Sequence, residues 1–362
     1  MVTIKDVARQ SGFSATTVSI VLNDAPLARY IPARTKHRIR RVAERLAYRP
    51  NPFARSLRSS RSHTVGVIIS DSVDPYIAQI LKGVENSLYQ SSYLSILADI
   101  QNHRARFERY VEMLLERRVE GLITIANSLL LDTDLLEVLG EKKIPMVVIG
   151  RETRSNSMSA VVIDNEPGTR AGMEHLYALG NRQIAFIKGP KQVVDSNQRW
   201  QGICGFAQEV GLKLDPRLIV ELEQTASSYQ GGYEAMRRLL SRRRPFTALM
   251  AFDDMTAFGA IRALHKAGRK VPEDCAVIGF DDIAAAAFYN PPLTTIRQPM
   301  ERLGTLAVEI LTEAVEAALN NRTFTAVNRR ITPELVVRES TPPLRVARPR
   351  RPPAALPAAE GQ

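Results

Sequence analysis

The sequence predicts a small helix-turn-helix head followed by a larger α/β core of two lobes. Three observations lead to this fold class. Positive charge is concentrated in the first 63 residues, which hold 13 Lys and Arg against three Asp and Glu. From about residue 63 to residue 340, short apolar runs alternate with amphipathic stretches of helical spacing. The chain of 362 residues is long enough for two or three domains.

Composition narrows the class of protein before any motif is considered. Hydrophobic residues make up 44% and charged residues 24%, an ordinary globular balance. No apolar run approaches the roughly 18 to 20 residues that a membrane helix needs, and the N-terminus lacks a secretory signal pattern. Cys204 and Cys275 are the two cysteines, too few for a disulfide framework. We expect a soluble protein of the reducing cytoplasm, with no membrane partner.

The net charge of +11 is distributed unevenly along the chain. The tail from residue 343 has four Arg and one Glu, which leaves the 279 residues between head and tail with a net charge of −2. A basic head on a near-neutral body indicates that the head binds a polyanion. The alternative is a solvated surface that happens to be basic.

Three short helices are predicted in the head. Thr3 and Asp6 have the spacing of a capping box, and Ser14 can cap a second helix after a turn at Gly12. Two short helices joined by a tight turn that contains Gly form a helix-turn-helix. The apolar stripes expected to face inward are Ile4, Val7 and Ala8, then Val18, Val21 and Leu22, and finally Ile39, Val42, Ala43 and Leu46.

The second of these helices has a small and nearly uncharged outer face, which consists of Ala15, Thr16, Ser19 and Ile20. Such side chains at the start of the helix can approach base edges in the major groove. Basic side chains of the third helix, beginning with Arg34, can hold phosphates. An ordinary three-helix bundle is the alternative interpretation.

The segment RPNPFARSLRS, residues 49–59, predicts a short linker helix. Asn51 can cap it and Pro52 suits its first position. The remaining stretch is barely two turns long, so it should not be stable alone in water. Leu57 lies among arginines, the composition of a wedge that enters the minor groove. A plain linker with a chance leucine is the alternative.

The stretches VTIKDVARQSGFSATTVSIVLND and YRPNPFARSLR resemble the DNA-binding head of the LacI/GalR family of bacterial transcription regulators. The resemblance implies a homodimer on a palindromic operator in double-stranded DNA, with hinge helices that form only on DNA, and a protein associated with the nucleoid. Ala15, Thr16 and Ile20 match base-reading positions, and Leu57 matches the wedge. The full set expected to contact DNA is Thr3, Ser14, Ala15, Thr16, Thr17, Ser19, Ile20, Asn23, Arg34, Tyr48, Asn51, Ala54, Leu57 and Arg58.

One of these positions departs from the family pattern. Relatives often have Arg or another polar residue where this chain has Ile20. We therefore expect base reading to depend on contacts with thymine methyl groups and on Thr16.

The body predicts parallel sheets covered on both faces, because continuous apolar strands alternate with helices. Helical stretches near 76–90, 105–118 and 131–140 separate the first strands, and a long helix is expected from Glu301 to Leu319. Ligands of such folds bind beyond the carboxyl ends of the strands. The expected strands are 65–70, 93–100, 121–126, 145–150, 159–164, 184–189, 218–222, 248–252, 275–280, 293–299 and a last one near 330–338.

The resemblance, which covers roughly residues 2–340, implies a periplasmic-binding-protein-like core of two α/β lobes joined by crossover strands. We expect a DNA-binding head at 1–49, a hinge at 50–62 and the core at 63–340. The first lobe is expected at about 63–163 and 297–325, and the second at about 164–292 and 326–340. Residues 341–362 form a Pro/Arg-rich tail that is expected to be disordered. Its prolines rule out the leucine heptads through which some relatives tetramerise, so a dimer is expected.

The same resemblance assigns residues to a small-molecule effector between the lobes. Arg199, Asp281 and Tyr76 match effector-contacting positions, and Asp253 stands where the family usually has Asn. Carboxylates that accept hydrogen bonds beside a donating Arg suit a polyhydroxylated, sugar-like ligand. Trp200, the single tryptophan, can stack on a sugar ring, although a core position is favoured. Asp253 and Asp281 have an alternative role as helix caps.

The motifs of phosphate loops, dinucleotide sites, nucleophile elbows and zinc proteases do not occur in the sequence. The five His residues are scattered along it. We therefore expect an effector-controlled transcription regulator, acting as a repressor, with no catalytic residue, metal or cofactor. A solute-binding receptor and a sugar-processing α/β enzyme are the alternatives.

Overall fold

The computed structural model describes residues 2–48, 61–125, 144–153, 158–191, 193–223 and 228–342. The chain divides into two compact units. The first is Met1–Thr64 with Glu116–Glu120, and the second is Val65–Leu115 with Gly121–Gln362. Among the described residues, no helix is both long enough and apolar enough to span a membrane.

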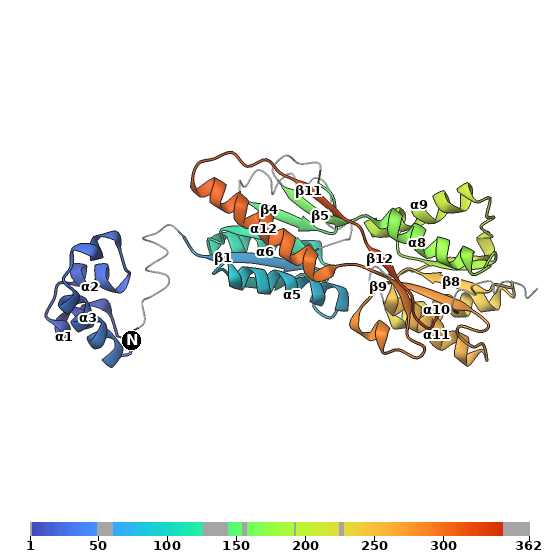
Figure 1. The fold of residues 1–362 in the computed structure, drawn as a ribbon, viewed down its shortest axis with the longest axis horizontal. Helices are drawn as coiled ribbons and strands as arrows, with labels where there is room; N and C mark the ends of the chain where they lie inside the picture. The colour runs from blue at the N-terminus through green and yellow to red at the C-terminus, as the bar shows by residue number, and fades with distance from the viewer. Residues whose placement is uncertain are drawn as a thin grey trace, which may run out of the picture. The chain divides into compact units, whose positions relative to one another are not determined.

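The head contains the three predicted helices and one short 3₁₀ helix between the second and third (Figure 1). The Asp6 carboxylate accepts hydrogen bonds from the backbone N–H and the hydroxyl of Thr3 at 2.9 and 2.7 Å. Gly12 ends the first helix with φ +76°, a conformation that suits glycine. The predicted apolar stripes are confirmed, since their side chains form one core. The elements are α1 (Ile4–Ser11), α2 (Ala15–Leu22), η1 (Pro26–Tyr30) and α3 (Ala33–Arg45).

Several predictions fall on residues that the structure does not describe. The hinge helix within 49–60 is one, together with the expected DNA contacts Asn51, Ala54, Leu57 and Arg58. The helix expected at 131–140 and the tail from residue 343 also lie outside the described residues.

The first lobe is built on a six-stranded sheet in the order β11-β5-β4-β3-β1-β2. Neighbouring strands from β11 to β1 in this order pair in parallel, and the central strands β3 and β4 are apolar and fully buried. Gly66 faces Leu114 of α6, so the neighbouring strand residues face α5 and α12 on the other side. The elements are β1 (Thr64–Ile69), α5 (Pro75–Gln90), β2 (Leu94–Asp99), α6 (Arg104–Glu116), β3 (Gly121–Ile125), β4 (Met146–Ile149), β5 (Ser159–Ile163), α12 (Met300–Leu319) and β11 (Asn328–Ile331).

The second lobe repeats the plan with the strand order β12-β10-β9-β8-β6-β7. Alternate residues of β6 enter different cores: Phe186 packs with α8 and α9, whereas Ile187 packs with α10 and α11. The sheet is thus covered on both faces, as predicted. The elements are α8 (Asn165–Ala178), β6 (Ile184–Lys188), α9 (Val194–Glu209), η2 (Pro216–Leu218), β7 (Ile219–Glu221), α10 (Tyr229–Ser241), β8 (Ala248–Ala251), α11 (Asp254–Lys266), β9 (Ala276–Asp281), η3 (Ala284–Ala287), β10 (Thr294–Arg297) and β12 (Glu334–Val336).

Three connections join the lobes: β5 to α8, β10 to α12, and β11 to β12 (Figure 1). The single strand expected near 330–338 is in fact two strands, one in each sheet. β11 pairs with β5 of the first sheet, whereas β12 pairs with β10 of the second. Residues 328–331 therefore belong to the first lobe, and the sequence-based assignment of 326–340 to the second lobe is wrong for this segment.

Candidate functional site

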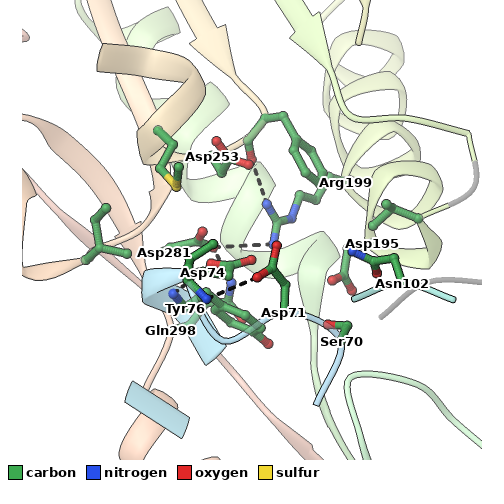
Figure 2. Close-up of a pocket in the computed structure, with 15 residues that line it drawn as sticks. Ser70, Asp71, Asp74, Tyr76, Asn102, Asp195, Arg199, Asp253, Asp281 and Gln298 are labelled. Atoms are coloured by element: carbon green, nitrogen blue, oxygen red, sulfur yellow. Dashed lines mark hydrogen bonds and ion pairs between the residues drawn. The ribbon is translucent and has the colours of Figure 1, made fainter. Parts of the chain in front are cut away.

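A cavity of about 90 Å³ lies where strands of both lobes end (Figure 2). From the first lobe, Ser70 and Asp71 follow β1, and Asn102 follows β2. From the second lobe, Asp253 follows β8 and Asp281 ends β9. This is the edge at which parallel α/β sheets bind ligands.

Arg199, on α9, is buried in the wall of this cavity with 7% of its surface exposed. Its Nε donates to Asn165 Oδ1 at 3.0 Å, and its Nη1 donates to the Phe252 carbonyl oxygen at 2.6 Å. The guanidinium lies 3.6 Å from the centre of the Phe280 ring, a cation–π contact. Nη2 stands 3.7 Å from Asp281 Oδ1. The guanidinium is thus fixed in place and retains N–H groups for a ligand.

Asp281 lies opposite Arg199 and accepts a hydrogen bond from the side-chain amide of Gln298. Its φ of +116° is unusual for a residue with a side chain and stores backbone strain. The next residue, Asp282, is anchored by ion pairs to Arg297 and Arg338 at 2.6 and 2.7 Å. Burial raises the pKa of Asp281 well above its usual range, although Arg199 opposes this. Asp281 caps no helix, because the next helix has Ile283 at its cap.

Two further aspartates of the cavity are helix caps as well as wall residues. Asp253 Oδ1 accepts from the Thr256 backbone N–H at 2.8 Å, so the cap alternative is correct for this residue. Asp74 Oδ1 accepts from the Tyr76 backbone N–H at 2.9 Å at the start of α5. Burial raises the pKa of Asp74 to about 6. Each carboxylate uses one oxygen as a cap and has a second for other partners.

The two aromatic predictions have different outcomes. Tyr76 lines the cavity, and burial raises its pKa well above 10. Trp200 does not line it. The indole packs edge-on against Phe186 at 5.7 Å between ring centres, in the core beside α8 and α9. Trp200 is half-buried, and it packs against this core rather than entering the cavity, which agrees with the packing role favoured from the sequence.

Sequence reasoning did not nominate several polar residues that the fold brings to the cavity. Asp71 and Asp74 come soon after the first strand. Because ligands of parallel α/β sheets bind beyond the carboxyl ends of the strands, the sequence could have indicated these two residues. Asp195 and Gln298 had no comparable signal. The structure brings Tyr76, Arg199, Asp253 and Asp281 together, as expected from the sequence. Among the described residues, no group of His, Cys, Asp and Glu has the geometry to hold a metal ion.

The described part of the head shows how the predicted DNA-reading residues are presented. Ala15, Thr16, Asn23 and Arg34 are exposed, whereas Ile20 is half-buried. The other described members of the set, Thr3, Ser14, Thr17, Ser19 and Tyr48, are exposed or half-buried. Ser14 Oγ accepts from the Thr17 backbone N–H at 3.1 Å, which holds the start of α2. The first turn of this helix therefore presents short side chains to solvent.

Comparison with known proteins matches both parts of the chain. Residues 3–51 match the family described as bacterial regulatory proteins, lacI family. Residues 173–341 match the periplasmic binding protein-like domain. An HTH-type transcriptional repressor PurR of Haemophilus influenzae (strain PittEE) is 36% identical over 343 residues, which cover 94% of this chain and 98% of the relative.

Solved structures show the same likeness over nearly the whole chain. The lac repressor dimer bound to operator and the anti-inducer ONPF has a TM-score of 0.81 at 27% identity, and the match covers 94% of this chain and 99% of the repressor. A complex of the transcriptional regulator CelR with cellobiose has a TM-score of 0.69 at 30% identity, covering 94% and 100%.

Proposed function

Because the chain belongs to the lacI family of bacterial regulatory proteins, we propose that a small polar ligand between its lobes controls how tightly its head holds operator DNA. The chain is a DNA-binding transcription repressor of this type. The proposal concerns the residues that read DNA, the ligand, and the link between the two.

DNA recognition is assigned to the exposed first turn of α2. Thr16 and Ala15 present small side chains that can reach base edges, and Arg34 of α3 can hold a phosphate. The lac repressor to which this chain is similar was solved as a dimer on operator. We assign the same dimeric assembly to this chain, because two half-sites of a palindrome need two heads. The place where it acts is then the nucleoid in the cytoplasm.

Exposed apolar side chains of the body support the dimer. Leu94 and Leu97 on the edge strand β2 are 68% and 47% exposed, and Tyr89 at the end of α5 is 85% exposed. In the second lobe, Tyr229 and Phe288 are 50% and 89% exposed. Tyr89, Leu94 and Leu97 are close together along the chain, so these exposed side chains can contribute to one site of association.

The ligand is assigned to the sugar class. Carboxylates of Asp253 and Asp281 accept from adjacent hydroxyls while Arg199 donates, which suits a polyhydroxylated molecule. The similar regulator CelR was solved with cellobiose.

One observation supports the coupling above all others: the polar groups of the cavity are tied to the connections between the lobes. Gln298, which donates to Asp281, is the first residue after β10 on the path to α12. Asn165, which accepts from Arg199, is the first residue of α8 after the crossing from β5. A ligand that moves Arg199 or Asp281 therefore acts directly on two of the three connections. A few kcal/mol of difference between two lobe arrangements is enough to shift operator affinity.

The test is a selection of DNA sequences from a randomised pool, followed by anisotropy titrations with the full chain. We expect a two-fold symmetric sequence bound by two chains, and strong loss of affinity for it in Leu57→Gly with an unchanged melting temperature of the body. An asymmetric sequence bound by one chain, or unchanged affinity of Leu57→Gly, would contradict the proposal.

A further inference from the structure

The cavity between the lobes is strongly acidic. Five aspartates line it, namely Asp71, Asp74, Asp195, Asp253 and Asp281, and Arg199 is the one Lys or Arg among its described lining residues. Figure 2 shows these side chains around the cavity. Among the described lining residues, this single guanidinium faces more carboxylates than it can balance, even when Asp195, which accepts from Asn165, is left out of the comparison.

Several of the carboxylate oxygens accept no hydrogen bond within the described part of the chain. Asp253 is 3% exposed and its Oδ1 is used as a helix cap, but its Oδ2 accepts no hydrogen bond from any described residue. The same holds for Oδ2 of Asp74 and of Asp281 within the described part of the chain. None of these three oxygens is among the fully buried polar atoms without a partner, so each is open to a ligand in the cavity. A ligand that donates several hydrogen bonds would satisfy them together.

Repulsion among these groups adds to the effect of burial on their pKa values. Burial, together with the charges of Asp253 and Asp71, raises the pKa of Asp74 to about 6. Asp281 is raised well above its usual range by burial, with Asp253 and Asp254 adding to the effect and Arg199 opposing it. A neutral ligand would leave this repulsion in place, and an anionic ligand would increase it. A cation would remove it.

We propose that the ligand of this cavity carries a protonated amino group, and that Asp253 with its neighbouring carboxylates selects such a ligand over neutral and anionic relatives. The inference rests on the proposed function, and it narrows the sugar class to an amine-bearing, polyhydroxylated molecule. An ammonium group has three N–H donors and no acceptor, which matches oxygens that only accept. Arg199 keeps free N–H groups for a hydroxyl of the same ligand, as its fixed geometry allows.

The test uses full-length protein and the low-molecular-weight extract of the cells that produce it, after a chelating resin has removed metal ions. The extract is divided at pH 7 on a cation exchanger into a retained fraction and a flow-through. The melting temperature of the protein is then measured with each. We expect the retained fraction to raise it and the flow-through to leave it unchanged.

Charge-removing variants identify the site. Asp253→Asn keeps the cap oxygen and the side-chain shape, so we expect the variant to fold. The concentration of the retained fraction that gives the wild-type rise in melting temperature should increase by roughly tenfold or more. Asp71→Asn, at a less buried position, is a second variant expected to weaken the response. Asp215→Asn, a capping aspartate of the second lobe that does not line the cavity, is the matched control and should respond like the wild type.

The outcomes separate the inference from the function beneath it. Activity in the flow-through, or wild-type responses of both Asp253→Asn and Asp71→Asn, would overturn the amine assignment and leave ligand control intact. Absence of a shift with every fraction would overturn ligand control itself, and the amine assignment with it.

Discussion

The side-chain amide of Gln298 donates a hydrogen bond to the carboxylate of Asp281, which joins a connection between the lobes to the wall of the cavity. At another connection, Asn165 Oδ1 accepts a hydrogen bond from Arg199 Nε at 3.0 Å. A charge bound in the cavity therefore changes groups that also fix the path of the chain from one lobe to the other.

Arg199→Lys should lower the free energy of unfolding by about 2–3 kcal/mol, because lysine cannot donate to both Asn165 and Phe252 and leaves a buried acceptor unpaired. Urea unfolding followed by circular dichroism measures this. Arg170→Lys is the control: Arg170 forms exposed ion pairs with Glu174 and Glu209, so its change should stay within about 0.5 kcal/mol. Equal effects of the two changes would contradict the role given to Arg199.

Asp74 makes the stability depend on pH in a defined direction. Its pKa is raised to about 6 in the folded protein, above the unfolded value of about 3.9. Between these values the folded state binds more protons, so the free energy of unfolding falls as pH rises from about 4 to 6. Asp74→Asn keeps the cap of α5 and removes this loss. We expect the variant to gain about 1–2 kcal/mol over the wild type between pH 4 and pH 7. A gain that is the same at both pH values would show that the carboxyl is not perturbed.

Gly259 and Gly205 should respond to alanine in opposite directions. A Cβ at Gly259 would overlap the carbonyl oxygen of Tyr229 where α11 crosses α10, and backbone cannot move aside cheaply. Gly259→Ala should therefore cost about 1–3 kcal/mol. Gly205 lies on the exposed face of α9 with no atom within 4 Å of its Cβ position, so Gly205→Ala should stabilise by about 0.5–1 kcal/mol. Thermal unfolding of both variants is sufficient, and destabilisation by Gly205→Ala would contradict the packing described.

Thr16 and Arg34 should affect DNA binding in different ways. Thr16→Ala should cost about 1–3 kcal/mol on the selected operator and little on random DNA, because a base contact is lost. Arg34→Ala should weaken both and reduce the salt slope of binding by about one, because a phosphate contact is lost. Anisotropy titrations at several salt concentrations separate the two. A uniform effect of Thr16→Ala would remove it from the base-reading set.

Most of the fold is a local property of the sequence and could be predicted. Strands such as β1 (Thr64–Ile69) contain continuous apolar runs, which are typical of a sheet covered on both faces. The prediction of a single strand in the segment 328–336 was wrong because Asn328–Ile331 is largely exposed at a sheet edge and has no apolar pattern. Its division between two sheets depends on where the lobes lie, which no local pattern records.

The cavity could be predicted only in part, for a related reason. The place of Arg199, Asp253 and Asp281 in the cavity could be predicted because each residue stands in a stretch that resembles a known family. Asp74 caps a helix and follows a strand, so its place in the cavity was open to prediction, but no local pattern shows that it also lies near Asp253 of the other lobe. Gln298 follows an ordinary strand, and its partner Asp281 is 17 residues away along the chain.

The central claim is that occupation of the cavity changes the affinity of the head for operator, and an anisotropy titration of labelled operator with and without the stabilising fraction tests it most directly. For the wild type we expect the dissociation constant to change by roughly tenfold or more, since coupling energies of about 1–3 kcal/mol are typical. Gln298→Met should still bind the ligand but show a smaller change. The same dissociation constant with and without ligand, in wild-type protein whose melting temperature that ligand raises, would contradict the account.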